Sequence, residues 1–183
     1  MRNNNDDDIK IFHPKKKEVA GSDLTSLAGI MDKHRANGNS TKAMFLGERL
    51  ADLTPEELCP EDAKKLKNNE LLQLRALMVF SSQIALTKYL PHTILSSQAV
   101  NAMYSKLEQT VPGFFANISD GSSFSFYYLT VRKDENVEEE IGKNFAMLCD
   151  KDDDTYLASL GTRIFDETED KVLSLIESFE FEY

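Results

Sequence analysis

The sequence predicts an all-α protein, folded as a single compact multi-helix domain around a central apolar helix at about residues 70–90. Residues 71–131 contain only five charged side chains, although charged residues make up 28% of the chain. Uncharged sequence concentrates where side chains leave water, so this segment is expected to form the core. Apolar residues also recur at helical spacing through most of the chain, and all five prolines fall outside the interiors of the predicted helices.

The central helix is predicted from an apolar pattern that covers most of its circumference. The residues that keep the helical period are Leu71, Leu74, Leu77, Met78, Ile84, Ala85 and Tyr89. Pro91 is expected to end the helix, because proline cannot continue a helical hydrogen-bond ladder. A helix that is apolar on several sides is normally packed on several sides. We therefore expect the other helices to surround this one.

The residues before the central helix predict an arm followed by four helical elements. Residues 1–21 are rich in Asn, Asp and Lys, which favours a flexible N-terminal arm, and 22–183 are expected to form one helical domain. Within that domain, apolar stripes predict a helix from about Ser22 and another over about 41–52. Two short helical turns then follow.

The first of these short turns has a strong local signal. Thr54 and Glu57 have the spacing of a capping box, and Pro55 stands at the first helical position. Pro60 forces the second turn to begin.

The residues after the central helix predict further helices. One is expected from Ser96 or Ser97 to Val111, and another over 137–148, opened by a capping box of Asn136 and Glu139. Two separate helices are then predicted around 157–164 and around 172–179. Four glycines lie inside the predicted helices, which indicates close helix approach, and these are Gly29, Gly47, Gly142 and Gly161.

Residues 124–131 are the ambiguous segment. Their aromatic and β-branched content suits a strand, which would give an α+β alternative with a small sheet from 9–13, 124–131 and 179–183. However, Phe124, Tyr127, Tyr128 and Val131 keep helical spacing, and both neighbouring segments are predicted to be helical. We therefore predict a helix at 124–131.

Charge and cysteine content narrow the function classes. The chain has a formal net charge of -10, which disfavours binding to nucleic acid or to anionic lipid. Its two cysteines, Cys59 and Cys149, belong to no Cys-x-x-Cys pair, so neither a disulfide scaffold nor a zinc site is indicated. The N-terminus lacks the apolar stretch of a signal peptide, and no apolar run approaches the length of a membrane span. These features predict an acidic, soluble, cytoplasmic protein without a metal or cofactor.

The common catalytic motifs are absent. No P-loop, dinucleotide-binding, nucleophile-elbow or HExxH pattern occurs, and the three histidines form no ligand-spaced pair. Asp150 begins a run that resembles the start of a calcium loop, but Thr155 stands where that loop needs glycine. No catalytic residue is therefore predicted, and an enzyme is not favoured.

Binding residues are expected in the charge-poor segment and in the aromatic segment 114–128. The candidates for ligand or partner binding are Arg75, Ser82, Gln83, His92, Phe126, Tyr127 and Tyr128. We expect an interaction or regulatory protein that holds a protein partner in an apolar groove near the aromatic segment. The alternative is a small-molecule binder or unfamiliar enzyme, with Arg75 and His92 meeting an anionic ligand. Self-association is a third possibility.

Overall fold

The computed structural model of the protein describes residues 21–133 and 135–182, with side chains from residue 26 onward. These residues form ten helices and no strand. The helices are α1 (Gly21–Ala36), α2 (Asn39–Ala51), α3 (Pro55–Leu58), α4 (Pro60–Ala63), α5 (Asn68–Tyr89), α6 (Thr93–Thr110), α7 (Pro112–Ser119), α8 (Ser122–Lys133), α9 (Val137–Leu148) and α10 (Thr155–Ser178).

This architecture confirms the all-α prediction over the α+β alternative. Residues 124–131 lie inside α8, and residues 179–182 follow α10 without forming a strand. Residues 9–13, the third segment of the alternative sheet, lie outside the described residues, as does most of the predicted arm over 1–21.

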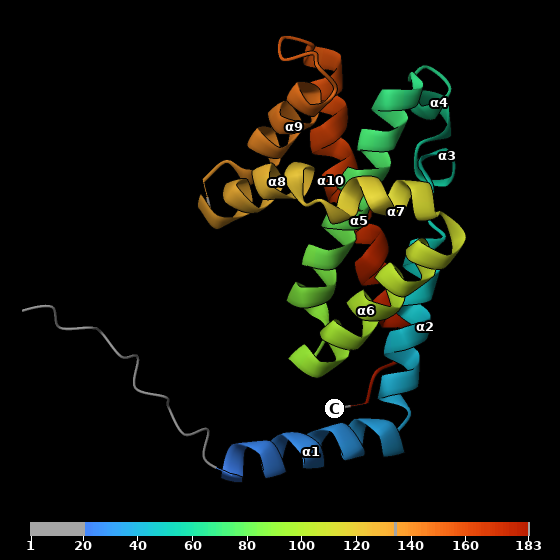
Figure 1. Ribbon diagram of the computed structural model, residues 1–183, viewed down its shortest axis with the longest axis vertical. Coiled ribbons are helices and arrows are strands. Elements are labelled where there is room, and N and C mark those ends of the chain that lie inside the picture. The colour runs from blue at the N-terminus through green and yellow to red at the C-terminus, as the bar shows by residue number, and fades with distance from the viewer. Residues whose placement is uncertain (1–20, 134, 183) are drawn as a thin grey trace, which may run out of the picture.

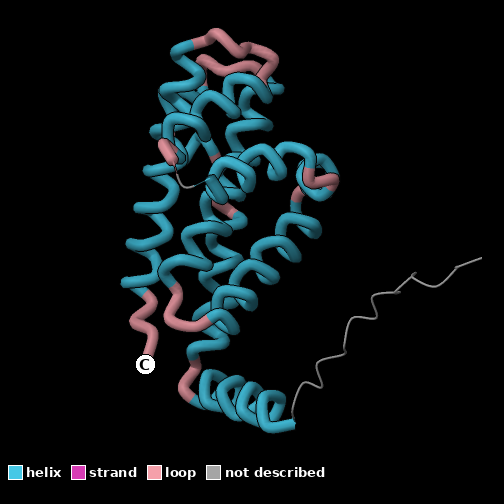
Figure 2. Tube along the Cα trace, turned by 90° about the vertical axis from the view of Figure 1, so that its left-hand side faces the viewer, coloured by secondary structure: helices cyan, strands magenta, loops and turns pink. Residues whose placement is uncertain are grey.

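The two longest helices, α5 and α10, run side by side along the long axis of the molecule (Figure 1). α9 packs on α10 in the upper half, and α2 packs along α6 in the lower half. α7 and α8 cross α5, and α1 lies across the lower end, where its main contact is with α2 (Figures 1 and 2). No helix in residues 21–133 and 135–182 is long and apolar enough to cross a membrane.

α5 is the central helix, as predicted. Its side chains Leu74, Leu77, Phe80 and Leu86 are fully buried, and the helix contacts α10, α6, α9 and α8. At its N-terminus, the Glu70 carboxylate accepts a hydrogen bond from the backbone N–H of Lys67 at 2.8 Å, which satisfies one of the unpaired donors of the first turn.

Glu70 also ties the first turn of α5 to the segment that joins α9 and α10. Its buried carboxylate lies 2.8 Å from the ammonium of Lys151. These two hydrogen-bond partners, Lys151 and the Lys67 backbone, hold the pKa of Glu70 below its usual value despite burial. The ion pair thus fixes one end of the central helix.

Two predictions about helix boundaries were wrong. Residues 155–178 form one continuous helix rather than two, because Thr168 is buried in its middle and its hydroxyl donates to the Ile164 carbonyl at 2.7 Å. α7 was not predicted, because Pro112 was interpreted only as the stop of α6, whereas it also opens α7 at the first helical position.

Both predicted capping boxes were also wrong in detail. Thr54 is the N-cap of α3, but its side chain makes no capping hydrogen bond. Asn136 precedes α9 in a left-handed conformation with φ of 49°, and its side chain does not cap the helix. A side-chain N-cap does form at α10, where Asp154 accepts from the Leu157 backbone N–H at 3.1 Å.

Close helix approach is confirmed at three of the four glycines predicted to allow it. A Cβ atom at Gly47 would overlap the carbonyl oxygen of Ala99 in α6, and one at Gly142 would overlap that of Ala158 in α10. At Gly161, an added Cβ would meet the ring of Phe145. Gly29 in α1 faces open space, so the prediction was wrong there.

We predict opposite effects of alanine at Gly47 and at Gly29. Gly47→Ala should lower the free energy of unfolding by about 1–3 kcal/mol, because α2 and α6 must separate to admit the methyl group. Gly29→Ala is the matched control, since it adds the same methyl group to an exposed helix interior and should be neutral or stabilising by up to about 1 kcal/mol. Urea unfolding measures both, and equal effects would contradict the close contact.

Candidate functional site

The predicted site residues do not form a single cluster. Gln83 and Tyr128 lie together where α8 packs on α5, and Phe126, two positions before Tyr128, lies at the other edge of the exposed side of α8. Ser82 and Tyr127 are buried. Arg75 lies in the first half of α5, and His92 lies beyond the end of that helix. The fourteen positions from Arg75 to the last residue of α5 correspond to about 21 Å of helix. The structure therefore does not bring Arg75 and His92 together.

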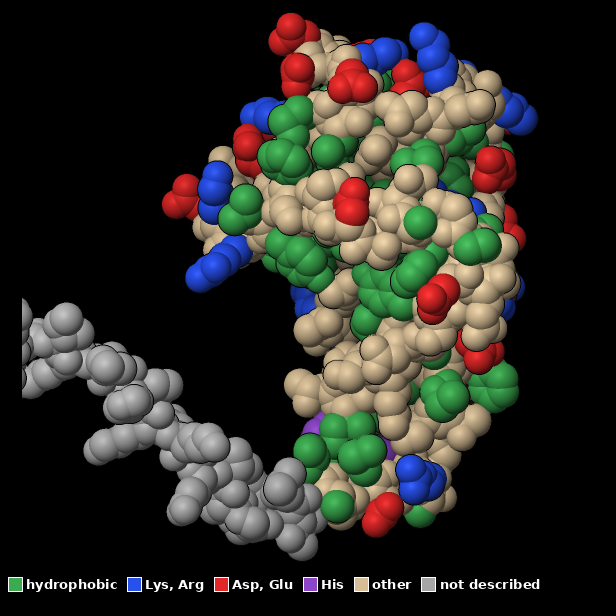
Figure 3. All heavy atoms as spheres, in the orientation of Figure 1, with side chains coloured by type: hydrophobic (Ala, Val, Ile, Leu, Met, Phe, Trp, Pro, Cys, Tyr) green, Lys and Arg blue, Asp and Glu red, His purple; other side chains and the backbone are tan. Residues whose placement is uncertain are grey.

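α8 has one buried face and one exposed apolar face. Phe124, Tyr127 and Thr130 point into the core. Phe126, Tyr128 and Leu129 are 44%, 41% and 58% exposed, and we call these three residues the α8 apolar face. Large apolar side chains that remain in water on one short helix are typical of interaction surfaces. Figure 3 shows hydrophobic side chains at the surface on either side of the band formed by α7 and α8.

Phe80 of α5 fixes the orientation of α8. Its ring packs against Phe124, Tyr127 and Tyr128, with centroid distances of 5.6, 5.2 and 5.0 Å. The contact with Tyr128 is edge-to-face, with an interplanar angle of 84°. One edge of Tyr128 is thus held by the core, while the rest of the ring remains in the exposed face.

Gln83 joins Tyr128 to α6. The Tyr104 hydroxyl donates to Gln83 Oε1 at 2.7 Å, and Gln83 Nε2 donates in turn to the Tyr128 hydroxyl. Burial raises the pKa of both phenols, so both remain protonated at neutral pH. Because the Tyr128 oxygen accepts from Gln83, its own hydrogen is available to donate outward, and no acceptor in the described part of the chain takes it.

Ser82 and Tyr127 are core residues rather than site residues in this structure. Ser82 is buried in α5, and Tyr127 is fully buried. The Tyr127 hydroxyl has no hydrogen-bond partner among the described residues, and burial raises its pKa strongly. An unpaired buried hydroxyl is destabilising, so the Tyr127 hydroxyl lowers the free energy of unfolding.

Arg75 lies in a shallow hollow beside α3 and α7. Its guanidinium carbon is 4.8 Å from the centroid of the Phe114 ring, in a cation–π contact. The hollow has a volume of about 250 Å³ and includes Glu56. Glu56 and Asp52 lie within electrostatic range of the guanidinium, although burial still lowers the pKa of Arg75. Because this surrounding is acidic, it opposes the binding of an anion.

His92 is the N-cap of α6 and holds the end of α1. Its Nδ1 accepts from the Ile94 backbone N–H at 3.2 Å, and its ring lies 5.3 Å from that of His34. The His34 Nδ1 is 3.4 Å from Asn39 Nδ2. Asn39 Oδ1 accepts from the Glu182 backbone N–H, so Asn39 Nδ2 must be a donor and His34 Nδ1 its acceptor. This arrangement favours a neutral His34.

The two cysteines are not placed as nucleophiles. Burial raises the pKa of Cys59 to about 11 and that of Cys149 to about 12, so both remain thiols at neutral pH. In residues 21–133 and 135–182, no group of three or more His, Cys, Asp or Glu side chains is arranged to hold a metal ion.

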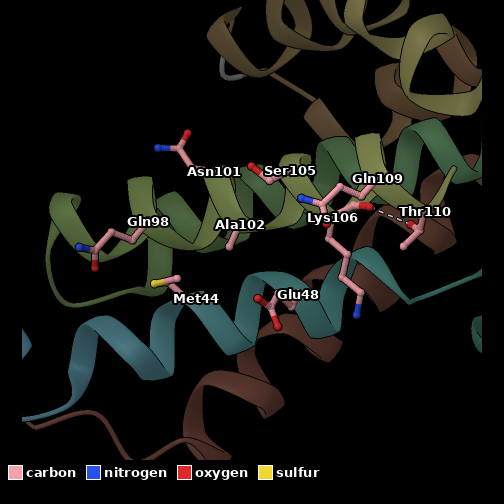
Figure 4. Close-up of a pocket in the computed structure, with 9 residues that line it drawn as sticks. All are labelled: Met44, Glu48, Gln98, Asn101, Ala102, Ser105, Lys106, Gln109 and Thr110. Carbon is pink, nitrogen blue, oxygen red and sulfur yellow. Dashed lines mark hydrogen bonds between the residues drawn. The ribbon is translucent and has the colours of Figure 1, made fainter. Parts of the chain in front are cut away.

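Two participants in the site were missed from the sequence. Leu129 is the most exposed residue of the α8 apolar face, and Tyr104 lies within the helix predicted to end at Val111 but was not among the predicted site residues. The spacing of Phe126 and Leu129, three positions apart in a helix, was the available signal for Leu129. A second concave surface, between α2 and α6, includes none of the predicted residues (Figure 4).

Comparisons with known proteins assign neither a family nor a function to this chain. No family model, no curated protein and no solved structure matches this chain.

We predict opposite effects on stability when the hydroxyl is removed from two tyrosines. Tyr127→Phe should raise the free energy of unfolding by about 1 kcal/mol, because it deletes an unpaired buried hydroxyl. Tyr104→Phe should lower the free energy of unfolding by about 1 kcal/mol, because it deletes the donor to Gln83 Oε1. Urea unfolding of both variants is the measurement. A loss of stability in Tyr127→Phe would show that this hydroxyl has a partner.

We also predict that the His34 contact weakens in acid. Burial is the largest cause of the lowered pKa of His34, followed by the charges of His92 and Lys33. The unfolded chain therefore binds more protons than the folded one as the pH falls through the usual histidine pKa of 6.5, so stability decreases in that direction.

The test compares wild type with His34→Gln. Between about pH 7.5 and about pH 5.5, the free energy of unfolding should fall more in wild type than in the variant. An equal decrease in the two proteins would contradict a contribution from His34.

Proposed function

We propose that this protein is an interaction protein that captures a partner through the α8 apolar face. The observation that carries the proposal is the exposure of Phe126, Tyr128 and Leu129 on one helix that packs against Phe80. Large aromatic side chains such as tyrosine often carry much of the binding energy of a protein interface. A side chain that packing already holds in place, as Phe80 holds Tyr128, loses little entropy on binding.

The partner that suits this face is an amphipathic helix with acidic residues. Residues 121–133 contain no Asp or Glu, and α8 ends with Arg132 and Lys133. Lys133 lies within electrostatic range of Glu140, and Arg132, the other cation of α8, forms no ion pair with any described residue. A partner helix would place apolar residues at intervals of three or four over Phe126 and Leu129. The outward Tyr128 hydroxyl would donate to an acceptor at the rim of the interface.

An anionic small molecule at the charge-poor centre has less support. Arg75 and His92 lie in separate places, and the hollow of about 320 Å³ beside Gln83 is lined by uncharged residues of α5 and α6. The net charge of -10 also disfavours a nucleic-acid partner. A cytoplasmic location belongs to the proposal, because two buried free thiols suit a reducing compartment.

The test removes the apolar character of the face without touching its buried side. In Phe126→Ser/Leu129→Ser, a specific partner captured from native lysate should fall at least about tenfold relative to wild type, as quantified by mass spectrometry. Phe45→Ser is the matched control, since Phe45 is similarly exposed on α2. Circular dichroism checks that each variant keeps its helical fold.

Two outcomes would count against the proposal. Capture of the same proteins in the same amounts by the double variant would overturn it. Loss of the partner in both the double variant and Phe45→Ser would also overturn it, because the loss would then not be specific to α8.

A further inference from the structure

We propose that a second surface, the groove between α2 and α6, binds an extended peptide segment of a partner protein. The groove has a volume of about 540 Å³, the largest among the hollows described above. α2 contributes Met44 and Glu48, and α6 contributes Gln98, Asn101, Ser105 and Gln109 (Figure 4). It lies on helices other than α8 and does not depend on the α8 apolar face.

Small residues at the helix crossing create the groove. Gly47 lets α2 approach the backbone of Ala99 so closely that no side chain fits between the two helices. On α6, the next positions toward the groove are Ala102 and Ser105, whose side chains are short. Longer side chains stand at both ends, Gln98 at one and Gln109 at the other (Figure 4). The result is a trough along α6 rather than a closed cavity.

The charge of the groove argues for a neutral ligand group. Lys106 is its one cation, and the Lys106 ammonium already pairs with the Asp52 carboxylate at 2.5 Å. Glu48 is its one acid. A phosphate or carboxylate would therefore find no unpaired cation among the lining residues, whereas a neutral peptide backbone meets no net repulsion.

The α6 wall offers side-chain amides, which match a peptide backbone. An Asn or Gln side chain donates and accepts at once, as a peptide unit does. Gln98, Asn101 and Gln109 line the groove at intervals along α6, and Asn101 points away from α2 (Figure 4). Gln98 Oε1 is buried and has no hydrogen-bond partner among the described residues, so the Gln98 side chain must turn before this oxygen accepts from a bound segment.

The protein already uses this pairing elsewhere. Asn39 Nδ2 donates to the Glu182 carbonyl at 2.6 Å, and the Glu182 backbone N–H donates to Asn39 Oδ1 at 3.0 Å. One amide side chain thus holds both polar groups of one residue in the segment after α10. Gln98, Asn101 and Gln109 can hold a partner's backbone in the same way.

The length of the groove sets the length of the bound segment. From Gln98 to Gln109 the helix rises about 16 Å, which an extended chain covers with about five residues. Met44 is 49% exposed on the opposite wall. Its flexible thioether can pack against one apolar side chain of the segment. The expected ligand is therefore a peptide of about five neutral residues with one apolar anchor.

Selection from a random 12-residue phage-displayed peptide library tests this proposal on the full chain. Enriched peptides should bind wild type and lose at least about tenfold in affinity for Ser105→Arg, which fills the trough with a long side chain. Ser159→Arg is the matched control, since Ser159 is an exposed serine on α10, and it should bind as wild type does. Nuclear magnetic resonance should show shifts of the side-chain amides of Gln98, Asn101 and Gln109.

Three results would overturn the proposal. They are a library that yields no enriched peptide, peptides that bind Ser105→Arg as tightly as wild type, and peptides that lose affinity only for Phe126→Ser/Leu129→Ser. The last result would place peptide binding on α8 instead.

Discussion

The rest of the structure depends on the burial of α5. This helix is apolar on several sides, and its residues 76–82 are all buried. No single neighbour can cover such a helix, so α10, α9, α8 and α6 each cover part of it. Its polar residues fit this environment, since the Ser81 hydroxyl donates to the Leu77 carbonyl at 2.9 Å within the helix. The Glu70–Lys151 ion pair then fixes the N-terminal end of α5 against the α9–α10 connection.

The two candidate surfaces, the α8 apolar face and the groove between α2 and α6, follow from the way the surrounding helices cover α5. α8 covers α5 through Phe124 and Tyr127, which engage Phe80, and the opposite side of this short helix is left in water. α2 and α6 cover the lower half by packing so closely on each other at Gly47 that a trough remains beside the contact. Both surfaces therefore lie beside contacts that cover α5.

Local patterns predicted most of the fold. The period of apolar residues identified α5, and the spacing of Phe124, Tyr127, Tyr128 and Val131 correctly favoured a helix at α8. The break predicted within α10 was wrong. Residues 166–171 are mostly charged and interrupt the apolar pattern, but the helix continues through them with Thr168 buried. The site was predicted less well. Exposure of Phe126 and burial of Tyr127 depend on which face meets Phe80, and the Asn39–Glu182 pair joins residues 143 positions apart. Such contacts between distant segments leave no local signal in the chain.

Hydrogen exchange of backbone amides tests the central role of α5 most directly. If α5 is the helix on which the others depend, its amides in residues 74–86 should exchange only through global unfolding and be the slowest in the molecule. The amides of α1, which lies across the lower end with its main contact to α2, should exchange much faster. Exchange of α5 at the rate of α1, while α2 and α6 remain protected, would contradict a fold organised around α5.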